Sequence, residues 1–205
     1  MDFFHYEKNV KDIEYYEILE NLMERWEYET VEFKEAKSNY DTDKIGRYFS
    51  ALSNEANLKQ QQYGWLIFGV SERDKIKHVV GTAYKQGEQS LLEKFKYEIS
   101  RDITNGMTFY EIKEIFPIVN GKRLRVLMFK VPAAATGIPT DWRTNYYERS
   151  GESLVPLKQY KIDAIRSQER KDWSKQVIEV ATIDNLDKTA INLAREKYKE
   201  KMNQE

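Results

Sequence analysis

The chain of 205 residues is 40% hydrophobic and 33% charged, with two histidines and no cysteine. This composition is typical of a globular protein with a heavily charged surface, large enough for one ordinary domain and a tail or for two small domains. The lack of cysteine excludes disulfides, thiolate catalysis, iron–sulfur clusters and cysteine zinc sites. No apolar run approaches the ~18 residues that a membrane span requires. We therefore expect a cytoplasmic protein without a membrane partner.

The charges are unevenly distributed along the chain. Residues 1–36 hold eleven acidic and four basic residues, a balance of −7, and the remainder holds 29 basic and 23 acidic residues, a balance of +6. A basic remainder of this size can attract a polyanion, although a solvated surface of mixed charge is the commoner arrangement.

The apolar pattern predicts alternating helices and strands in the first third of the chain. Residues 12–26 carry apolar residues at mostly helical spacing with acids between them, and residues 30–34 alternate as a half-buried strand does. Asp41 and Asp43 can cap a helix whose apolar residues recur at i, i+3, i+4, i+7 and i+11 from Ile45. Residues 63–70 are almost continuously apolar, which is typical of a strand covered on both faces.

The middle of the chain predicts a short strand, a helix and a hairpin. We expect the strand at 76–80, the helix at 91–103, and the hairpin strands at 108–117 and 124–131. Asn120-Gly121 lies between the two hairpin strands, and Asn-Gly between apolar runs is the strongest short-range hairpin signal.

The last part of the chain predicts a transition from a folded domain to a helical extension. We expect a short strand at 146–149, a turn at Ser150-Gly151 and a helix at 157–166. A further helix begins at Lys188, and its thin apolar stripe requires a partner surface, as in a linker, a dimer arm or the start of a further domain.

These elements predict an α/β or α+β fold, a mixed β-sheet layered with helices and followed by a helical carboxyl-terminal extension. The expected parts are an acidic amino-terminal helix over 1–26, a folded domain over 27–168, and a linker or tail over 169–205.

Glycine motifs for nucleotide binding are not supported. Gly64 and Gly69 have the spacing of a phosphate-binding P-loop, but Val70 and Ser71 follow where the phosphate lysine is required, and the run is an apolar strand. The sequence contains neither a dinucleotide-binding motif nor a nucleophile elbow. We therefore expect no ATPase activity from this chain alone.

Acidic residues near the first strand suggest a cation site. Glu32 and Lys34 share one strand face, which is typical of the E-x-K element of metal-dependent nucleases. Glu72 follows the apolar strand at its carboxyl end, where α/β sheets place ligands. If the two strands pair, Glu27, Glu32 and Glu72 can hold Mg²⁺ or Mn²⁺ while Lys34 steadies the phosphate or attacking water. Among 34 acidic residues the same grouping also arises by chance, and Glu32 and Lys34 then form a weak surface pair.

Basic and aromatic residues are concentrated between residues 118 and 149. Cations hold phosphates and flat rings stack on exposed bases, so this region predicts nucleic-acid contact. Alternatively, Tyr147 or Tyr146 fills the core and the other side chains solvate a hairpin. Arg149, beside a glycine turn, can either brace a loop or bind a phosphate bidentately. The candidate contacts are Arg123, Arg125, Lys130, Arg143, Tyr147 and Arg149.

An ordered set of segments over about residues 20–168 resembles the Schlafen-type AlbA_2 domain. The segments are Glu29–Glu35, Ser50–Asn54, Gly64–Val70, Val80–Thr82, Pro139 with Trp142, and Tyr146–Leu154. The link into the central strand departs from the family pattern, because Asn54 leads through a longer glutamine-rich loop to a lone Gly64.

This resemblance implies binding of DNA or RNA. It implies the amino-terminal part, or a shortened version, of a bacterial transcriptional regulator or RecG-like helicase relative. By motif position it also implies that the three-carboxylate RNA-cleaving site of animal Schlafen proteins falls on Glu27, Glu32 and Glu72, with Glu72 replacing an aspartate. A single lobe would need a homodimer to form a basic groove.

Three hypotheses stay open from the sequence. The first is a nucleic-acid-binding module without enzymatic activity, dimeric in solution. The second is a Mg²⁺- or Mn²⁺-dependent endoribonuclease that uses the three glutamates. The third is a protein-interaction or oligomerisation domain, motivated by the acidic first helix and the thin-striped tail.

Overall fold

The computed structural model describes residues 12–24, 29–73, 76–87, 89–151, 153–168 and 187–202. The chain divides into two compact units, residues 1–170 and residues 171–205. The fold is α+β, as expected from the sequence. Its described helices are α1 (Ile13–Glu24), α2 (Thr42–Leu58), α3 (Gln89–Asp102), α4 (Gln159–Ser167) and α5 (Lys188–Met202), with a 3₁₀ turn at Thr104–Gly106.

A mixed four-stranded sheet with the strand order β1-β2-β8-β5 forms the centre of the first unit. β1 runs parallel to β2, and the other neighbouring strands are antiparallel. Shorter ladders join β9-β10-β11, β3-β4 and β6-β7. The strands are β1 (Val31–Lys34), β2 (Tyr63–Phe68), β3 (Val70–Arg73), β4 (Ile76–Val79), β5 (Glu111–Ile115), β6 (Ile118–Val119), β7 (Lys122–Arg123), β8 (Val126–Pro132), β9 (Asp141–Trp142), β10 (Asn145–Ser150) and β11 (Ser153–Pro156).

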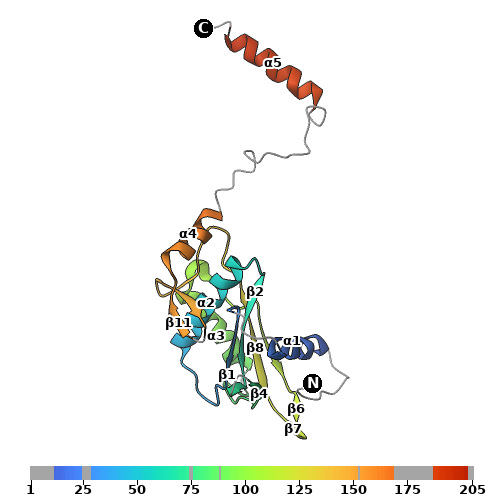
Figure 1. Ribbon diagram of the computed structural model, residues 1–205, viewed down its shortest axis with the longest axis vertical. Helices are drawn as coiled ribbons and strands as arrows, with labels where there is room; N and C mark the ends of the chain where they lie inside the picture. Colours follow the sequence, from blue (N-terminus) through green and yellow to red (C-terminus); the bar gives the residue numbers. More distant parts are fainter. Residues whose placement is uncertain are drawn as a thin grey trace. The chain divides into compact units, whose positions relative to one another are not determined.

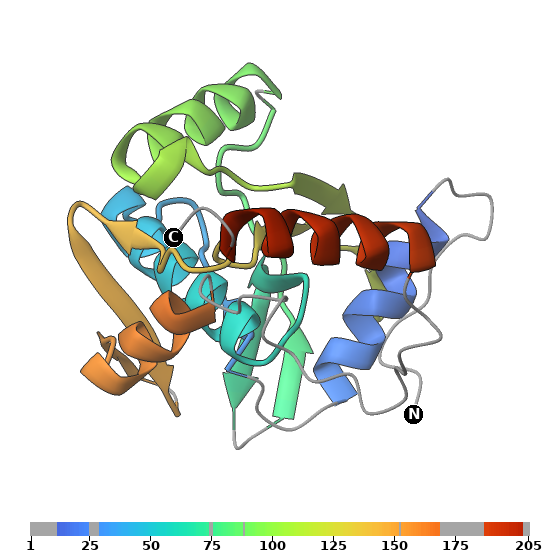
Figure 2. The same cartoon turned by 90° about the horizontal axis from the view of Figure 1, so that it is seen from above.

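Helices cover both faces of this sheet, with α1 on one side and α2 and α3 on the other (Figures 1 and 2). The side chains of β2 alternate accordingly. Trp65 and Ile67 join the cluster under α1, whereas Leu66 and Phe68 join the cluster under α2 and α3. Burial on both faces explains why the sequence of β2 is continuously apolar rather than alternating.

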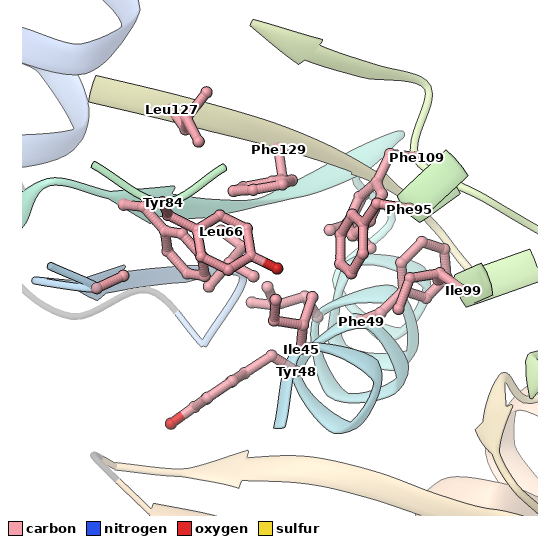
Figure 3. Packing of buried hydrophobic residues seen from close by; sticks show 14 of the residues in the cluster. Ile45, Tyr48, Phe49, Leu66, Tyr84, Phe95, Ile99, Phe109, Leu127 and Phe129 are labelled. Carbon is pink, nitrogen blue, oxygen red and sulfur yellow. The ribbon is translucent and has the colours of Figure 1, made fainter. Parts of the chain in front are cut away.

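An aromatic cluster fills the layer between the sheet and helices α2 and α3 (Figure 3). Phe129 of β8 lies with its ring centroid 4.9 Å from that of Phe68 and 5.2 Å from that of Phe109. Tyr48 extends from α2 away from the other labelled side chains, whereas the Tyr84 ring lies within the cluster. The edge-to-face contact of Phe129 with Phe68 adds to the free energy that burial of the rings provides.

The apolar run predicted as one strand over 63–70 is interrupted at Gly69. Its φ of +93° turns the chain between β2 and β3, and a Cβ there would lie 2.7 Å from the carbonyl oxygen of Arg125. Glycine is required at this position because a side chain would be both strained and obstructed. The Gly69 carbonyl accepts hydrogen bonds from the amides of Val80 and Gly81, which ties the β3–β4 hairpin to the sheet.

The Asn-Gly hairpin is confirmed, although its long strands are subdivided. Asn120 and Gly121 have φ values of +50° and +72°, and the adjacent residues Val119 and Lys122 pair across the turn. Positive φ at both central residues fits the right-handed twist of the flanking strands. The hairpin therefore joins β5 to β8, which are neighbours in the main sheet.

The first and last helices differ from each other in burial. α1 buries Tyr16, Leu19 and Met23, and residues 25 and 26 of the predicted helix lie outside the described residues. α5 buries none of its residues within the described part of its unit. None of the helices that the structure describes is long and apolar enough to span a membrane.

We expect Tyr84→Phe to raise the free energy of unfolding by ~1 kcal/mol. The Tyr84 hydroxyl is buried and has no hydrogen-bond partner among the described residues. Removing it relieves the cost of desolvating an unsatisfied polar group while leaving the ring in place. Urea unfolding of both proteins measures the change. A lower free energy of unfolding for Tyr84→Phe would contradict the prediction that the Tyr84 hydroxyl is buried without a hydrogen bond.

Candidate nucleic-acid interface

A row of buried polar residues on α2 positions the β9–β10 region. Asn54 Nδ2 donates to the carbonyl oxygens of Thr140 (2.9 Å) and Tyr147 (3.2 Å), and its Oδ1 accepts from the Thr140 amide (2.8 Å). Ser50 Oγ donates to the Thr140 carbonyl (2.7 Å) and accepts from the Tyr147 amide (3.1 Å). The Ser53 and Thr140 hydroxyls lie 2.8 Å apart. Because buried polar groups must be paired, these bonds fix β10 against α2.

Trp142 provides a second fastening of the same region. Its ring occupies the space over Gly46, where a Cβ would lie 2.1 Å from a ring carbon. Its Nε1 donates to Asp43 Oδ1 at 2.7 Å. This bond is the main reason why the pKa of Asp43 is lowered, and Arg47 and Arg143 contribute in the same direction against the effect of burial. Because the Trp142 ring fills the space that a Cβ would need, Gly46 is required by packing rather than by its backbone conformation.

The region held in this way places Arg149 against the edge of the main sheet. Glu32 of β1 is buried, with 4% of its side chain exposed, and its two oxygens face two cations. Lys34 Nζ lies 2.5 Å from Oε1, and Arg149 Nη2 lies 2.7 Å from Oε2. Arg149 also donates to the carbonyl oxygens of Val31 and Gly151. One carboxylate between two cations leaves a local excess of one positive charge.

Lys34 packs against a tyrosine ring. Its ammonium lies 5.1 Å from the centre of the Tyr48 ring. Burial acts to lower the pKa of Lys34, but the Glu32 carboxylate outweighs burial and the pKa is raised above its ordinary value. Burial, Tyr48 and Glu32 raise the pKa of Tyr40. Lys34 therefore stays charged and Tyr40 stays neutral at physiological pH.

A second buried charge cluster lies on the other side of β10. The Lys161 ammonium of α4 lies between Glu55 of α2 and Glu148 of β10, 2.9 Å from Glu148 Oε2. Glu55 and Glu148 are only 2% and 1% exposed. Burial raises the pKa of Glu55 despite the opposing effect of Lys161. This triad joins three elements of the first unit at one buried point.

A pocket of about 410 Å³ opens next to this triad. Lys59 Nζ and Glu29 Oε2 form an ion pair of 2.5 Å at its wall, and the hydrogen bond from Lys59 lowers the pKa of Glu29 against the effect of burial. The pocket lies between the carboxyl end of α2, the β10–β11 turn and the first turn of α4. Its lining residues include Glu29, Glu55, Lys59, Glu148, Arg149, Gly151, Lys158, Tyr160 and Lys161.

The structure separates the six residues predicted to contact nucleic acid. Arg125 is buried; its guanidinium pairs with Glu114 and donates to the Tyr84 carbonyl at 2.8 Å, so it braces the sheet. Lys130 lies on the α1 face, 4.1 Å from the centre of the Tyr63 ring. These two placements give no support to a direct role in binding nucleic acid.

The other four predicted contacts are distributed over three places. Arg123 is exposed on β7 and lies over the Phe116 ring. Arg143 pairs with Asp102 at 2.9 Å. Tyr147 and Arg149 are brought together on β10, where Tyr147 packs against the α2-side core. The six residues therefore do not form one continuous patch.

The three predicted metal ligands are not brought together among the described residues. Glu27 lies outside them. Glu72 is exposed on β3 and pairs in register with Lys77, whose ammonium lies 5.3 Å from the Phe33 ring on the α1 side. Glu32 faces the α2 side, where Lys34 and Arg149 already occupy its oxygens. The part of the chain that the structure describes contains no group of three His, Asp or Glu residues suited to a metal. The three-carboxylate site stays a prediction.

Comparison with known proteins establishes the family. Residues 27–158 match the model of the family described as Schlafen, AlbA_2. The chain therefore belongs to the Schlafen AlbA_2 family. No curated protein matches the chain.

Among solved structures, the DIP2311 protein from Corynebacterium diphtheriae is similar, at 23% identity and a TM-score of 0.44. The match covers 82% of this chain and 29% of that one, so the present chain spans less than a third of the length of that protein.

We expect Arg149→Ala to lower the free energy of unfolding by ~3 kcal/mol, because it removes one of the two cations that compensate a buried carboxylate. Arg123→Ala, a matched change of an exposed arginine on β7, should stay within ~0.5 kcal/mol of the parent protein. Denaturant unfolding measures both. An equal change in the free energy of unfolding for the two substitutions would show that the buried Glu32 carboxylate does not need Arg149 for its compensation.

We expect Asp43→Asn to reduce the acid sensitivity of the fold. The pKa of Asp43 is lower in the folded protein than its ordinary value of 3.8. The ionised side chain therefore stabilises the fold at a pH above 3.8, and this stabilisation is lost as the pH falls through the pKa of the folded state. Asparagine keeps the oxygen that accepts from Trp142 but does not titrate. Thermal unfolding between neutral and acidic pH should therefore give a flatter profile below about pH 4.

The control for this substitution is Asp163→Asn, which changes an exposed carboxylate on α4. It should retain the pH profile of the parent protein. Parallel profiles for the parent and Asp43→Asn would contradict the prediction.

Proposed function

We propose that this AlbA_2 domain binds DNA or RNA through the face that contains the pocket, without cutting the strand. The membership of residues 27–158 in the Schlafen AlbA_2 family carries the proposal, because it is consistent with a domain of nucleic-acid-binding type. Further support comes from the charges around β10. Lys34 and Arg149 exceed the charge of Glu32 by one, and in the adjacent pocket the three lysines Lys59, Lys158 and Lys161 match the three carboxylates Glu29, Glu55 and Glu148, so the excess of one positive charge remains.

The fixed position of these cations supports the proposal further. All of these cations except the exposed Lys158 are held in ion pairs with described glutamates, so little side-chain entropy is lost when a phosphate binds to them. Phosphate contacts of this kind give affinity without base identity. The choice between DNA and RNA therefore needs a separate test. The proposal also includes a role in regulation and a homodimer that doubles the surface, and each of these needs its own test.

Binding should weaken steeply with salt, because each phosphate contact releases counterions. For three to four contacts on a single strand, we expect the logarithm of the binding constant to fall with the logarithm of salt concentration at a slope of about −2 to −3. A filter-binding panel of tRNA, single-stranded DNA and duplex DNA at several salt concentrations measures this slope. Binding that is absent for all three, or independent of salt, would contradict the proposal.

Two further measurements make the panel decisive. Lys158→Gln should reduce the slope by about 1, whereas Lys94→Gln, an exposed lysine on α3, should not change it. Parallel incubations with Mn²⁺ and with EDTA test the endoribonuclease hypothesis, because metal-dependent shortening of the RNA would show cutting. Sedimentation of the same samples reports the oligomeric state.

A further inference from the structure

The β6–β7 hairpin carries positive charge that no described acidic residue balances. Residues 116–124 contain Lys122 and Arg123 and no acidic residue, so the hairpin has a charge of +2. Both side chains are exposed, and neither forms an ion pair with any residue that the structure describes. Glu114, on the strand that leads into the hairpin, already pairs with Arg125. The two cations are therefore available to an anionic partner.

The hairpin is anchored at its base and open to solvent at its tip. Val119 and Leu124 pack against the apolar cluster under α1, and the Leu124 amide donates to the Pro117 carbonyl at 2.9 Å. Residues 120–123 are all exposed, and a Cβ on Gly121 would have no atom within 4 Å. The hairpin lies at an end of the first unit (Figure 1). A large partner can therefore approach its tip without obstruction by the described part of this unit.

The β3–β4 hairpin adds a cation at the same end of the first unit (Figure 1). A Cβ on Gly81, just after β4, would lie 3.5 Å from the Leu124 side chain, so the bases of the two hairpins are neighbours. Arg73 is exposed at the end of β3, and Glu72 lies opposite Lys77 in the ladder. The described residues of this hairpin therefore keep an excess of one positive charge, which adds to the +2 of the β6–β7 hairpin.

This surface is separate from the pocket beside β10. The pocket is lined by Leu58 and Lys59, which immediately precede the start of β2. The β6–β7 hairpin lies beyond Val126 of β8, next to the pair of Phe68 with Leu127 at the other end of β2. The pocket and the hairpins therefore lie at opposite ends of the main sheet.

The composition of the hairpin tip favours contact with phosphates over contact with unpaired bases. Proteins that bind single strands use exposed aromatic rings on which bases stack. Residues 120–123 include no aromatic residue, and the half-buried Phe116 ring has the Arg123 guanidinium 4.8 Å from its centre. A duplex, whose bases are already paired and stacked, presents the phosphates that these cations require.

The geometry of the hairpin favours DNA over RNA as the duplex. Lys122 and Arg123 are consecutive on β7, and consecutive residues of a strand point to opposite faces. A ribbon with one cation on each face suits a groove that has a phosphate backbone on each side. The major groove of B-form DNA, about 12 Å wide, admits a two-stranded ribbon, whereas the major groove of A-form RNA is deep and narrow.

We infer that the β6–β7 hairpin enters the major groove of duplex DNA, with Lys122 and Arg123 at the phosphates of opposite strands and Arg73 at the adjacent backbone. This inference rests on the proposed function. It names the kind of nucleic acid that is bound and adds a second contact surface to the face that contains the pocket.

The test compares one labelled sequence as duplex DNA, duplex RNA and single-stranded DNA. Fluorescence anisotropy at several salt concentrations measures the dissociation constant and the salt slope for each. We expect duplex DNA to bind about tenfold more tightly than either of the others, which is the change that one charge-assisted contact provides. Equal affinity for the three nucleic acids overturns the inference.

Variants connect this preference to the hairpin. The double substitution Lys122→Gln with Arg123→Gln should reduce the salt slope on duplex DNA by about 2 and leave the slope on single-stranded DNA unchanged. The matched control, Lys44→Gln with Lys94→Gln, removes the same charge from exposed positions on α2 and α3 and should leave both slopes unchanged. All four positions are exposed, and thermal midpoints confirm that the fold is intact. Equal slopes for the two double variants on duplex DNA overturn the inference.

The outcomes separate this inference from the proposed function. Salt-dependent binding that the hairpin substitutions do not change leaves the proposed function standing and removes the hairpin contact. Vesicles of phosphatidylcholine and phosphatidylserine provide the remaining comparison. If Lys122 and Arg123 are needed to bind these vesicles but not duplex DNA, the inference is overturned in favour of a lipid surface. No binding to any nucleic acid removes both the inference and the proposed function.

Discussion

The buried carboxylate of Glu32 is the constraint on which the candidate site depends. A charge that is almost fully removed from water destabilises a fold unless opposite charges and hydrogen bonds surround it. Lys34 provides one partner from the same strand, but the second must come from elsewhere, and Arg149 of β10 provides it. Arg149 also binds the Val31 carbonyl at the edge of the sheet. Glu32 is therefore neutralised only when β10 lies against this edge of the sheet.

The polar residues of α2 hold β10 in this position from its other side. Ser50 and Asn54 are costly to bury in a helix, and they are satisfied by backbone groups of Thr140 and Tyr147. Glu148, between Tyr147 and Arg149, points instead to Lys161 and so attaches α4. Consecutive residues of one short strand thus connect α2, the sheet edge and α4. The pocket lies where these three attachments meet.

This arrangement changes how the charged residues of the domain are interpreted. Several basic residues that suggest a polyanion surface in the sequence are components of the fold, since Arg125 braces the sheet and Arg143 pairs with Asp102. The cations that remain near the pocket are fewer, and Lys59, Arg149 and Lys161 among them are held in ion pairs. A small number of positioned cations favours contact at one place on a strand over a long basic groove. Glu32, whose two oxygens face Lys34 and Arg149, contributes to the positioning of β10.

The class of fold, most elements and the family can be predicted from the amino-acid sequence, because they depend on local periodicity, turn chemistry and ordered motifs. The strand at Phe33, the hairpin at Asn120-Gly121 and the helix after Asp41 were all predictable for this reason. Which charged residues are buried, and which partners they have, becomes known only from the packing of the folded chain. The pairs Glu32 with Arg149 and Glu55 with Lys161 join residues more than a hundred positions apart, and no local pattern distinguishes them from solvated glutamates. Burial is a property of the whole packing arrangement, and it separates a structural charge from one that a ligand can use.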